Sequence, residues 1–403
     1  MGKVFEGIRV VDFTNNVAGP CATAMMADQG AEIIKIERPV AGDDSRGIAP
    51  RLEGQSLQFN WFNRGKKSIE LSLKDPEAQE LIKKMIADAD IVVESFKPGQ
   101  MAKFGLDYQS IVKIKPDIIY CSVSACGQTG GYSRRPGFDV IAQGMSGFMD
   151  MQGDPDGPPV KSGTAIGDYV GVLSAYSGII TALYHKQLTG EGQYIDVSLL
   201  DSLISVMSPL ENAATLGAHP TRSGRHHGTM APYGIYRGKN GQSVVIAAFT
   251  ASQWAKLCKA IDMPEMENDP KFATNALRVA NIQELETVLE SWLSKYDNIE
   301  DALDIMDKAG VACCKIKSLY EVAHDPVLWE RGSLVKLPLP PSYKEHRTIN
   351  ARGPWIKYSR TPSEMHRAPD LGENNVEILE KYGWSEEKIA SKIAEWSSNF
   401  KKQ

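Results

Sequence analysis

Strand-forming runs alternate with helical segments along the N-terminal part of the chain, and this alternation limits the possible folds. The expected strands are Ile8 to Phe13, Ala31 to Glu37, Ser68 to Leu73, Asp90 to Phe96 and Ile118 to Ser124. The expected helices are Cys21 to Gln29, Pro76 to Ala89 and Tyr108 to Ile114. Strands that alternate with helices form a parallel sheet covered on both faces. We therefore expect an α/β fold with a ligand site in the crevice at the carboxyl ends of the strands.

The pattern changes in the second half of the chain. With 403 residues the chain is long enough for about two domains. Tyr233 to Arg237 and Ser243 to Phe249 flank Lys239-Asn240-Gly241, which predicts a β-hairpin. Helical patterns follow at Ile282 to Lys295 and Ile299 to Ala309, and a Pro-rich stretch from Leu337 to Pro341 is typical of a linker.

Composition excludes several classes of function. A formal net charge of −5 argues against nucleic acid as a main partner, because phosphate backbones need a basic surface. The six cysteines form no CxxC pair and no HExxH motif occurs, so we expect no metal site and a reducing, cytoplasmic setting. We found no apolar run long enough to span a membrane and therefore expect no membrane partner.

Asp168 stands just before a long helix of small residues, in the sequence Gly163-Thr-Ala-Ile-Gly-Asp168. Such a carboxylate can be an ordinary N-cap that accepts bonds from the first free N–H groups of the helix. It can also be a poorly solvated carboxylate that acts as a nucleophile. The local sequence leaves both interpretations open.

Basic residues follow two of the expected strands. Arg38 comes directly after Glu37, Lys97 follows Phe96, and Lys103 lies shortly beyond. A crevice lined with Arg and Lys suits a phosphorylated ligand. A dinucleotide is disfavoured, because the first strand–helix turn lacks GxGxxG and contains Pro20, which removes one helix-start N–H. Glu37 does stand where a ribose-binding acid would be expected.

Several segments together resemble the class III CoA-transferases of the CaiB/BaiF type, which include formyl-CoA transferase and carnitine CoA-transferase. The resemblance covers nearly the whole chain. The matching blocks are Ala18-Gly-Pro20, Ala27-Asp28, Gly30 to Arg38, Asn63 to Leu73, Val93 to Gly99, Pro159 to Asp168, Asp196 to Asp201, Ala231 to Gly234, His324-Asp-Pro326 and Ala368 to Glu373. One departure is Asn374, where a His is usual in the family.

The resemblance implies that Asp168 attacks an acyl-CoA thioester and passes CoA to a free carboxylic acid through an aspartyl anhydride and an aspartyl-CoA thioester. The cofactor is then coenzyme A, and the partners are an acyl-CoA donor and a small carboxylic-acid acceptor. The resemblance also implies that Arg38 binds the adenosine phosphates and that Lys97 and Lys103 bind the diphosphate. The groove for nucleotide and pantetheine would be lined by Asn16, Val17, Leu71, Leu73, Ser95 and Phe96.

The resemblance also implies an architecture. It implies a Rossmann-like large domain at residues 1–200 and 340–403, a smaller inserted α+β domain at 225–325, linkers at 201–224 and 326–339, and an interlocked homodimer.

The sequence leaves the acid unidentified and keeps alternatives. Formyl-CoA transferases carry Gln where this chain has Val17, and a tetraglycine loop that is not found here, which disfavours formate and oxalate. An α-methylacyl-CoA racemase needs a His before Asp139, but Phe138 stands there, so two-base proton transfer lacks a partner. A non-catalytic CoA-binding protein would need no carboxylate at Asp168. An NAD-dependent oxidoreductase would need a glycine fingerprint at residues 14–20.

Overall fold

The chain forms two compact units in a computed structural model that describes residues 2–400. The large unit comprises Met1–Phe148, Lys161–Leu210 and Pro326–Gln403. The small unit comprises Met149–Val160 and Glu211–Asp325.

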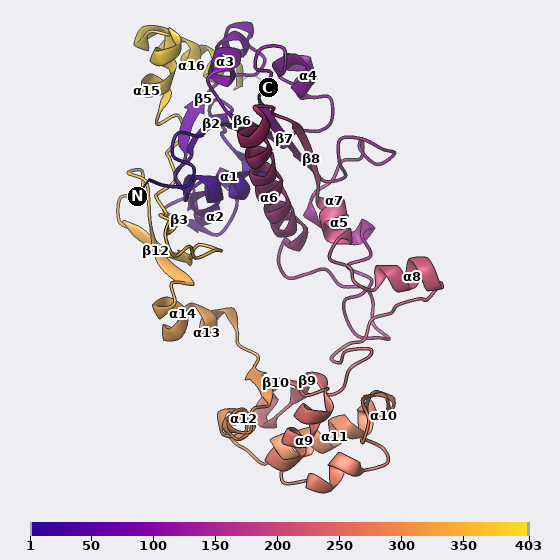
Figure 1. Ribbon diagram of the computed structural model, residues 1–403. Coiled ribbons are helices and arrows are strands. Elements are labelled where there is room, and N and C mark those ends of the chain that lie inside the picture. The colour runs from indigo at the N-terminus through magenta and orange to yellow at the C-terminus, as the bar shows by residue number, and fades with distance from the viewer. Residues whose placement is uncertain (1, 401–403) are drawn as a thin grey trace. The chain divides into compact units, whose positions relative to one another are not determined.

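A six-stranded parallel sheet forms the centre of the large unit, in the order β5-β2-β1-β6-β7-β8 (Figure 1). Its strands are β1 (Arg9–Phe13), β2 (Glu32–Glu37), β5 (Lys67–Glu70), β6 (Ile91–Glu94), β7 (Ile119–Ser124) and β8 (Tyr194–Ser198). The α/β fold with a large parallel sheet expected from the sequence is confirmed. The sequence analysis missed the edge strand β8.

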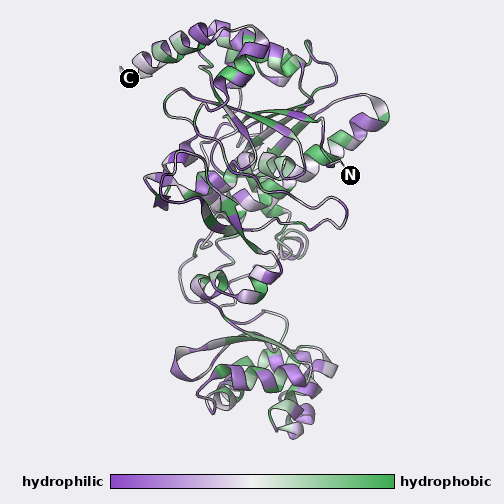
Figure 2. Ribbon diagram, turned by 90° about the vertical axis from the view of Figure 1, so that its left-hand side faces the viewer, coloured by the Kyte–Doolittle hydropathy of each residue, from purple (hydrophilic) through white to green (hydrophobic). Residues whose placement is uncertain are grey.

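Helices cover both faces of this sheet, because successive strand residues point to opposite sides. Val10 packs into one core and its neighbour Val11 into the other. The first face carries α1 (Ala18–Ala27), α2 (Leu57–Phe62), α5 (Asp139–Met145), α6 (Ile166–Thr189) and α7 (Leu199–Ile204). The second carries α3 (Pro76–Ala87), α4 (Tyr108–Ile111), α15 (Asn375–Leu379) and α16 (Glu386–Phe400). The terminal helix α16 mixes hydrophilic and hydrophobic residues, as expected of an amphipathic surface helix (Figure 2).

Helix α6 corrects one expectation from the sequence. Its length and composition are those of a helix that could cross a membrane, which the sequence analysis did not recognise. The helix packs against α1, α7 and strands β7 and β8, and 39% of its most apolar window is buried within the protein. Gly171 permits this packing, because a Cβ there would lie 2.4 Å from Cδ2 of Leu199. One face of α6 therefore packs into the core of the large unit, and the other face is exposed in the single chain.

The small unit contains an antiparallel sheet of order β11-β10-β9. Its strands are β9 (Tyr233–Arg237), β10 (Ser243–Ala247) and β11 (Ala312–Lys315). The hairpin between β9 and β10 lies where the sequence predicted it, and Asn240 takes a positive φ of 58° in its turn. The helices of this unit include α8 (Leu210–Leu216), α9 (Ala251–Ala260), α10 (Asn275–Ala280), α11 (Ile282–Leu293), α12 (Ile299–Lys308) and α13 (Leu319–Ala323).

The structure differs from the expected domain boundaries in three places. Residues 201–224, expected as a linker, are divided between the large unit, up to Leu210, and the small unit, from Glu211. Met149–Val160, expected in the large domain, belongs to the small unit. Residues 326–339, expected as a linker, belong to the large unit and include α14 (Pro326–Glu330) and β12 (Leu334–Pro338). Strand β12 pairs with β13 (Thr348–Arg352), and Pro338 is tolerated because it ends a strand of a two-stranded ribbon.

Candidate active site

Asp168 lies in the first turn of α6, but it does not cap that helix. The N-cap residue, Ala165, offers no side-chain bond. Asp139, from the first turn of α5, accepts hydrogen bonds through Oδ1 from the backbone N–H groups of Gly167 (2.7 Å) and Asp168 (3.2 Å). The capping interpretation of Asp168 is therefore wrong, because a neighbouring helix supplies the cap. The capping hydrogen bonds of α6 thus go to Asp139 and not to the Asp168 carboxylate.

Asp139 is itself held in place by Gln143, one helical turn later. The Gln143 amide donates to Oδ2 of Asp139 at 2.6 Å, and its carbonyl oxygen accepts from the backbone N–H of Ser162 at 3.0 Å. This clamp fixes the start of α5 against the segment that leads into α6. In the sequence, Asp139 was considered only as the neighbour of the racemase position, and Gln143 was not considered. The spacing of Asp139 and Gln143 on one helix face was the available signal.

Burial and a like charge act together on Asp168. Burial, and secondly the negative charge of Asp139, raise the pKa of Asp168 to about 7. A carboxylate with a raised pKa is a stronger base and a better nucleophile than an ordinary one. Phe138, at the position of the racemase histidine, is 71% exposed and offers no acid–base group. The turn therefore presents one reactive carboxylate without a second base at that position.

The helix that packs against α6 begins near the same edge of the sheet. Helix α1 follows the turn Thr14-Asn15-Asn16-Val17, and Asn16 has a positive φ of 65°. Ala18, the first residue of α1, lies close to α6, since a Cβ on Gly171 would lie 3.7 Å from that of Ala18. The first N–H groups of a helix have no partner within it, so the start of α1 can stabilise negative charge nearby.

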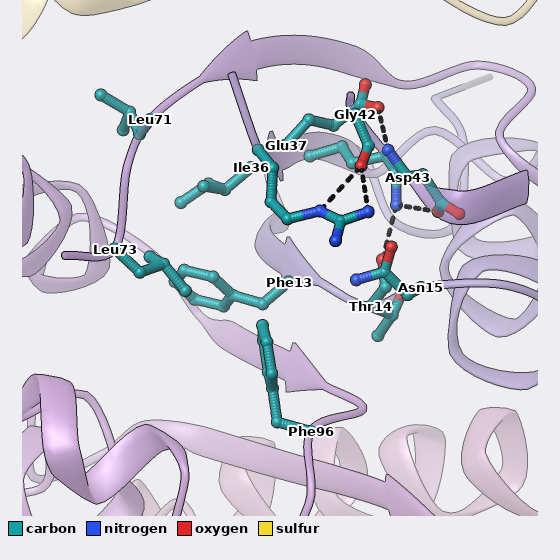
Figure 3. A pocket seen from close by; sticks show the side chains of 12 residues that line it. Phe13, Thr14, Asn15, Ile36, Glu37, Gly42, Asp43, Leu71, Leu73 and Phe96 are labelled. Atoms are coloured by element: carbon teal, nitrogen blue, oxygen red, sulfur yellow. Dashed lines mark hydrogen bonds and ion pairs between the residues drawn. The ribbon is translucent and has the colours of Figure 1, made fainter. Parts of the chain in front are cut away.

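A pocket opens at the carboxyl ends of β1, β2, β5 and β6, as expected for a sheet of this kind. One side is apolar and is formed by Phe13, Ile36, Leu71, Leu73 and Phe96 (Figure 3). The other side is polar and includes Thr14, Asn15, Lys35, Glu37, Arg38, Gly42 and Asp43. The free volume of this pocket is only about 20 Å³, close to that of one water, so a ligand ring would have to lie in the adjoining groove.

A larger groove of 1010 Å³ shares Arg38, Leu71, Leu73 and Phe96 with this pocket. It extends past Lys74 to the C-terminal helix α16, where its wall is formed by Lys392, Glu395, Trp396 and Asn399. The sequence analysis did not foresee that the last helix reaches this edge. Its wall is available to a ligand that extends out of the pocket.

The structure brings together only some of the predicted ligand-binding residues. Arg38, Leu71, Leu73 and Phe96 line the pocket and the groove. Ser95 supports the pocket from behind, because its Oγ accepts the backbone N–H of Asn15 at 2.8 Å. The remaining predicted residues, which do not line either cavity, are Asn16, Val17, Lys97, Lys103 and Asp168.

Arg38 and Glu37 have different roles in the pocket wall. Arg38 donates twice to the carbonyl of Gly42, at 3.2 Å each, and pairs with Asp44 at the surface. Glu37 accepts from Arg46 at 2.7 and 2.6 Å and from Ser68 at 2.6 Å, so its carboxylate is committed to internal contacts. A ribose-binding acid is therefore not offered at Glu37, which further weakens the dinucleotide alternative. Within residues 2–400, no group of three or more His, Cys, Asp and Glu side chains could hold a metal ion.

The family model for CoA-transferase family III matches residues 5–375. The chain belongs to this family. This confirms the resemblance, and the chain is a family III CoA-transferase, an enzyme class whose substrates are CoA thioesters.

Curated relatives and a solved structure agree with this assignment. A succinyl-CoA:glutarate CoA-transferase of Mus musculus is 37% identical over 94% of this chain and 86% of its own length. A succinate–glutarate CoA-transferase of Agrobacterium fabrum is 37% identical over 93% of this chain and 94% of its own. The crystal structure of a CAIB/BAIF family protein from Brucella suis, 34% identical, covers 95% of this chain and all of that chain with a TM-score of 0.82.

Proposed function

We propose that this CoA-transferase moves CoA from succinyl-CoA to a second dicarboxylic acid, with glutarate as the first candidate, and that Asp168 carries the reaction. The relatives named for succinyl-CoA and glutarate support the substrate class. The proposed catalytic role is supported by the environment of Asp168. Its carboxylate is largely buried, has a pKa of about 7, and is relieved of capping by Asp139.

The proposed reaction runs in two half-reactions on one carboxylate. An oxygen of Asp168 attacks the thioester carbon, the C–S bond breaks, and the CoA thiolate leaves a mixed anhydride behind. The thiolate then attacks the aspartyl carbon, which releases the donor acid and forms an aspartyl-CoA thioester. The acceptor carboxylate attacks this thioester and expels the thiolate, which finally attacks the acceptor's carbonyl carbon. The product acyl-CoA leaves, and Asp168 is regenerated.

The surroundings of Asp168 suit these steps. Negative charge develops on each carbonyl oxygen under attack. The start of α1 provides N–H groups and the positive end of a helix dipole near it, whereas α6, whose first N–H groups bond to Asp139, contributes its dipole alone. The Asp139 carboxylate disfavours a second negative charge beside it, which raises the energy of ionised Asp168 and favours its reaction.

We propose that CoA occupies the groove at the strand ends, beside the small pocket whose wall it shares. Arg38 would bind the adenosine phosphates, and Leu71, Leu73 and Phe96 would contact the adenine. Lys97 and Lys103 are exposed and would meet the diphosphate as it leaves the groove. The pantetheine arm would run toward α1 and would contact Asn16, Val17 and Ser95.

We also propose a homodimer in the cytoplasm. Helix α6 exposes Leu173 (45%), Tyr184 (61%) and Leu188 (66%), although an isolated surface helix would carry polar residues there. A second copy of the chain is the proposed cover for this apolar face. All six cysteines, which lie within the described residues, are free thiols, as expected in a reducing compartment.

The test of activity is direct. Purified enzyme is incubated with succinyl-CoA and glutarate, and glutaryl-CoA is measured by chromatography. Formation of glutaryl-CoA without net loss of thioester supports transfer, whereas hydrolysis alone contradicts it. A parallel incubation of a 2-methylacyl-CoA in deuterated water checks the racemase alternative. We expect no deuterium at the α-carbon, because Phe138 supplies no base.

A further inference from the structure

A buried ion pair lies directly behind the pocket. Nζ of Lys35, on β2, is 2.8 Å from Oδ2 of Asp43, and both side chains are completely buried. Lys35 also donates to the carbonyl of Thr14 at 2.7 Å. Burial lowers the pKa of Lys35, but the charges of Asp43 and Asp12 outweigh it and raise that pKa above its usual value. The pair is therefore ionised. Buried ion pairs add little net stability to a fold, so we ask whether this pair fixes the geometry of the loop around it.

The other oxygen of Asp43 holds the turn that precedes α1. Oδ1 accepts hydrogen bonds from the backbone N–H of Asn16 (3.1 Å) and from Ser45 N and Oγ (2.8 and 2.7 Å). Asn16 is in the left-handed region, which asparagine tolerates better than most residues other than glycine. The bond from Asn16 to Asp43 holds this conformation, and a second tie runs from Asp44 N to Oδ1 of Asn15 at 3.3 Å.

Asp43 thereby joins the nucleotide pocket to the reaction centre. On one side, its loop carries Gly42, whose carbonyl accepts both bonds from Arg38. On the other side, Asn16 leads through Val17 into α1, which packs on the first turns of α6 near Asp168. Every contact in this path is between residues of the large unit.

We propose that Asp43 is a positioning residue that couples occupation of the nucleotide pocket to the geometry of the turn before α1. This inference rests on the proposed function. Binding energy from the distant nucleotide would then be used to align the thioester with Asp168, and would appear in kcat as well as in KM. A merely structural Asp43 would affect thermal stability and leave the kinetics of the folded enzyme unchanged.

The experiment compares two donors, succinyl-CoA and succinyl-pantetheine, in the wild-type enzyme and in Asp43→Asn. The wild-type kcat should fall about tenfold or more when the nucleotide is removed. In Asp43→Asn, kcat with succinyl-CoA should fall by about tenfold, while kcat with succinyl-pantetheine should change less than about twofold. The ratio of the two kcat values therefore drops toward one. An unchanged ratio in the variant, or a wild-type ratio of one, overturns the coupling.

Two variants of Asn16 keep the test decisive if Asp43→Asn does not fold. Asn16→Ala and Asn16→Gly both delete the side chain, but only alanine disfavours the positive φ. We expect a lower kcat ratio for Asn16→Ala than for Asn16→Gly. Equal ratios would contradict a role for the turn.

A matched control removes a buried ion pair elsewhere. Asp28, at the opposite end of α1, pairs with Arg64 at 2.5 Å, and Asp28→Asn should lower the melting temperature without changing the kcat ratio. A ratio that falls equally in Asp28→Asn would assign the effect to general destabilisation and overturn the proposal. Failure of the proposed function is distinguishable, because the wild-type enzyme would then transfer neither CoA from succinyl-CoA nor pantetheine from succinyl-pantetheine.

Discussion

At the scale of single residues, the chemistry depends on the division of work between two aspartates. Asp139 is the helix cap and Asp168 is the free carboxylate, and the charge of the first acts on the second. The two carboxylates, in the first turns of α5 and α6, thus have different environments and different tasks. Such separation is a common way for enzymes to prepare one reactive group.

The pH dependence follows from the raised pKa of Asp168. The nucleophile must be ionised, and below its pKa of about 7 it is mostly protonated. We expect kcat/KM for succinyl-CoA to rise with pH through about 7 and then level off. A rate already at its plateau at pH 5, measured by initial velocities at constant ionic strength, would contradict this assignment.

Asp139→Asn separates charge from capping. Asparagine is as good an N-cap as aspartate, so α6 should remain intact, but the repulsion on Asp168 is removed. We expect the midpoint of the pH–rate profile to move to lower pH. Asp139→Ala should in addition lower the free energy of unfolding by about 1 kcal/mol, measured by urea denaturation, because the cap is lost. A midpoint unchanged in both variants would exclude an influence of Asp139.

Replacement of Asp168 itself should separate chemistry from binding. Asp168→Ala is expected to abolish transfer while CoA affinity, measured by calorimetry, stays within a few-fold of wild type, because Asp168 lines neither CoA cavity. Since Asp139 supplies the cap, the variant should also keep its stability. A variant that retains full turnover would remove Asp168 from the reaction.

Sequence reasoning reached Asp168 and Arg38 but not their supports. Asp139 caps a helix from 28 residues earlier in the chain, and no local pattern reports such a bond. Lys35 looks like an ordinary strand lysine in the sequence, and its burial becomes visible only when the Asp43 loop folds over it. A sequence motif therefore does not predict supporting contacts of this kind, because they form only when a distant loop or helix folds against the site.

At the scale of secondary-structure elements, the C-terminal helix extends the groove proposed for CoA. Lys392, Glu395, Trp396 and Asn399 all come from α16 and face the same groove as Arg38. The helix is anchored by Lys392 and Trp396, which bond to Asp75 at 2.9 and 3.0 Å. A helix from the far end of the chain thus contributes to a site that begins at β1.

Glu395→Lys tests this placement. Glu395 is half-exposed at the groove wall, and reversing its charge should lower KM for succinyl-CoA by about two- to fivefold at low salt, with less effect at high salt. The gain should be smaller for the dephospho-CoA thioester, which lacks the 3′-phosphate. Glu386→Lys, the same charge change at the start of α16, serves as the control. Equal effects of both variants would place the nucleotide elsewhere.

The strands show why some elements are predictable and others are not. Strands β1, β2, β6 and β7 are buried on both faces, so each appears in the sequence as a mostly apolar run, although Asp12 and Lys35 interrupt β1 and β2. Strand β12 was expected to be a linker because of its prolines. It forms only because β13, ten or more residues later, supplies the partner. The sequence of β12 alone therefore does not indicate that it pairs with β13.

At the scale of the whole molecule, the apolar face of α6 is the feature that a single chain leaves unexplained. Leu188→Asp should weaken the proposed dimer, because a charge buried in an apolar interface is costly. Light scattering should give twice the chain mass of 44.2 kDa for the wild-type protein and a concentration-dependent fall toward 44.2 kDa for the variant. Val4→Asp, at another exposed apolar residue, is the control. A wild-type mass of one chain would refute the dimer.

The most direct test of the account is to trap the covalent enzyme. Wild-type protein is incubated with succinyl-CoA, treated with hydroxylamine, and digested for mass spectrometry. We predict a hydroxamate on the peptide that contains Asp168, dependent on succinyl-CoA and absent from Asp168→Ala. A hydroxamate on another carboxylate, or none while glutaryl-CoA is being formed, would contradict the account.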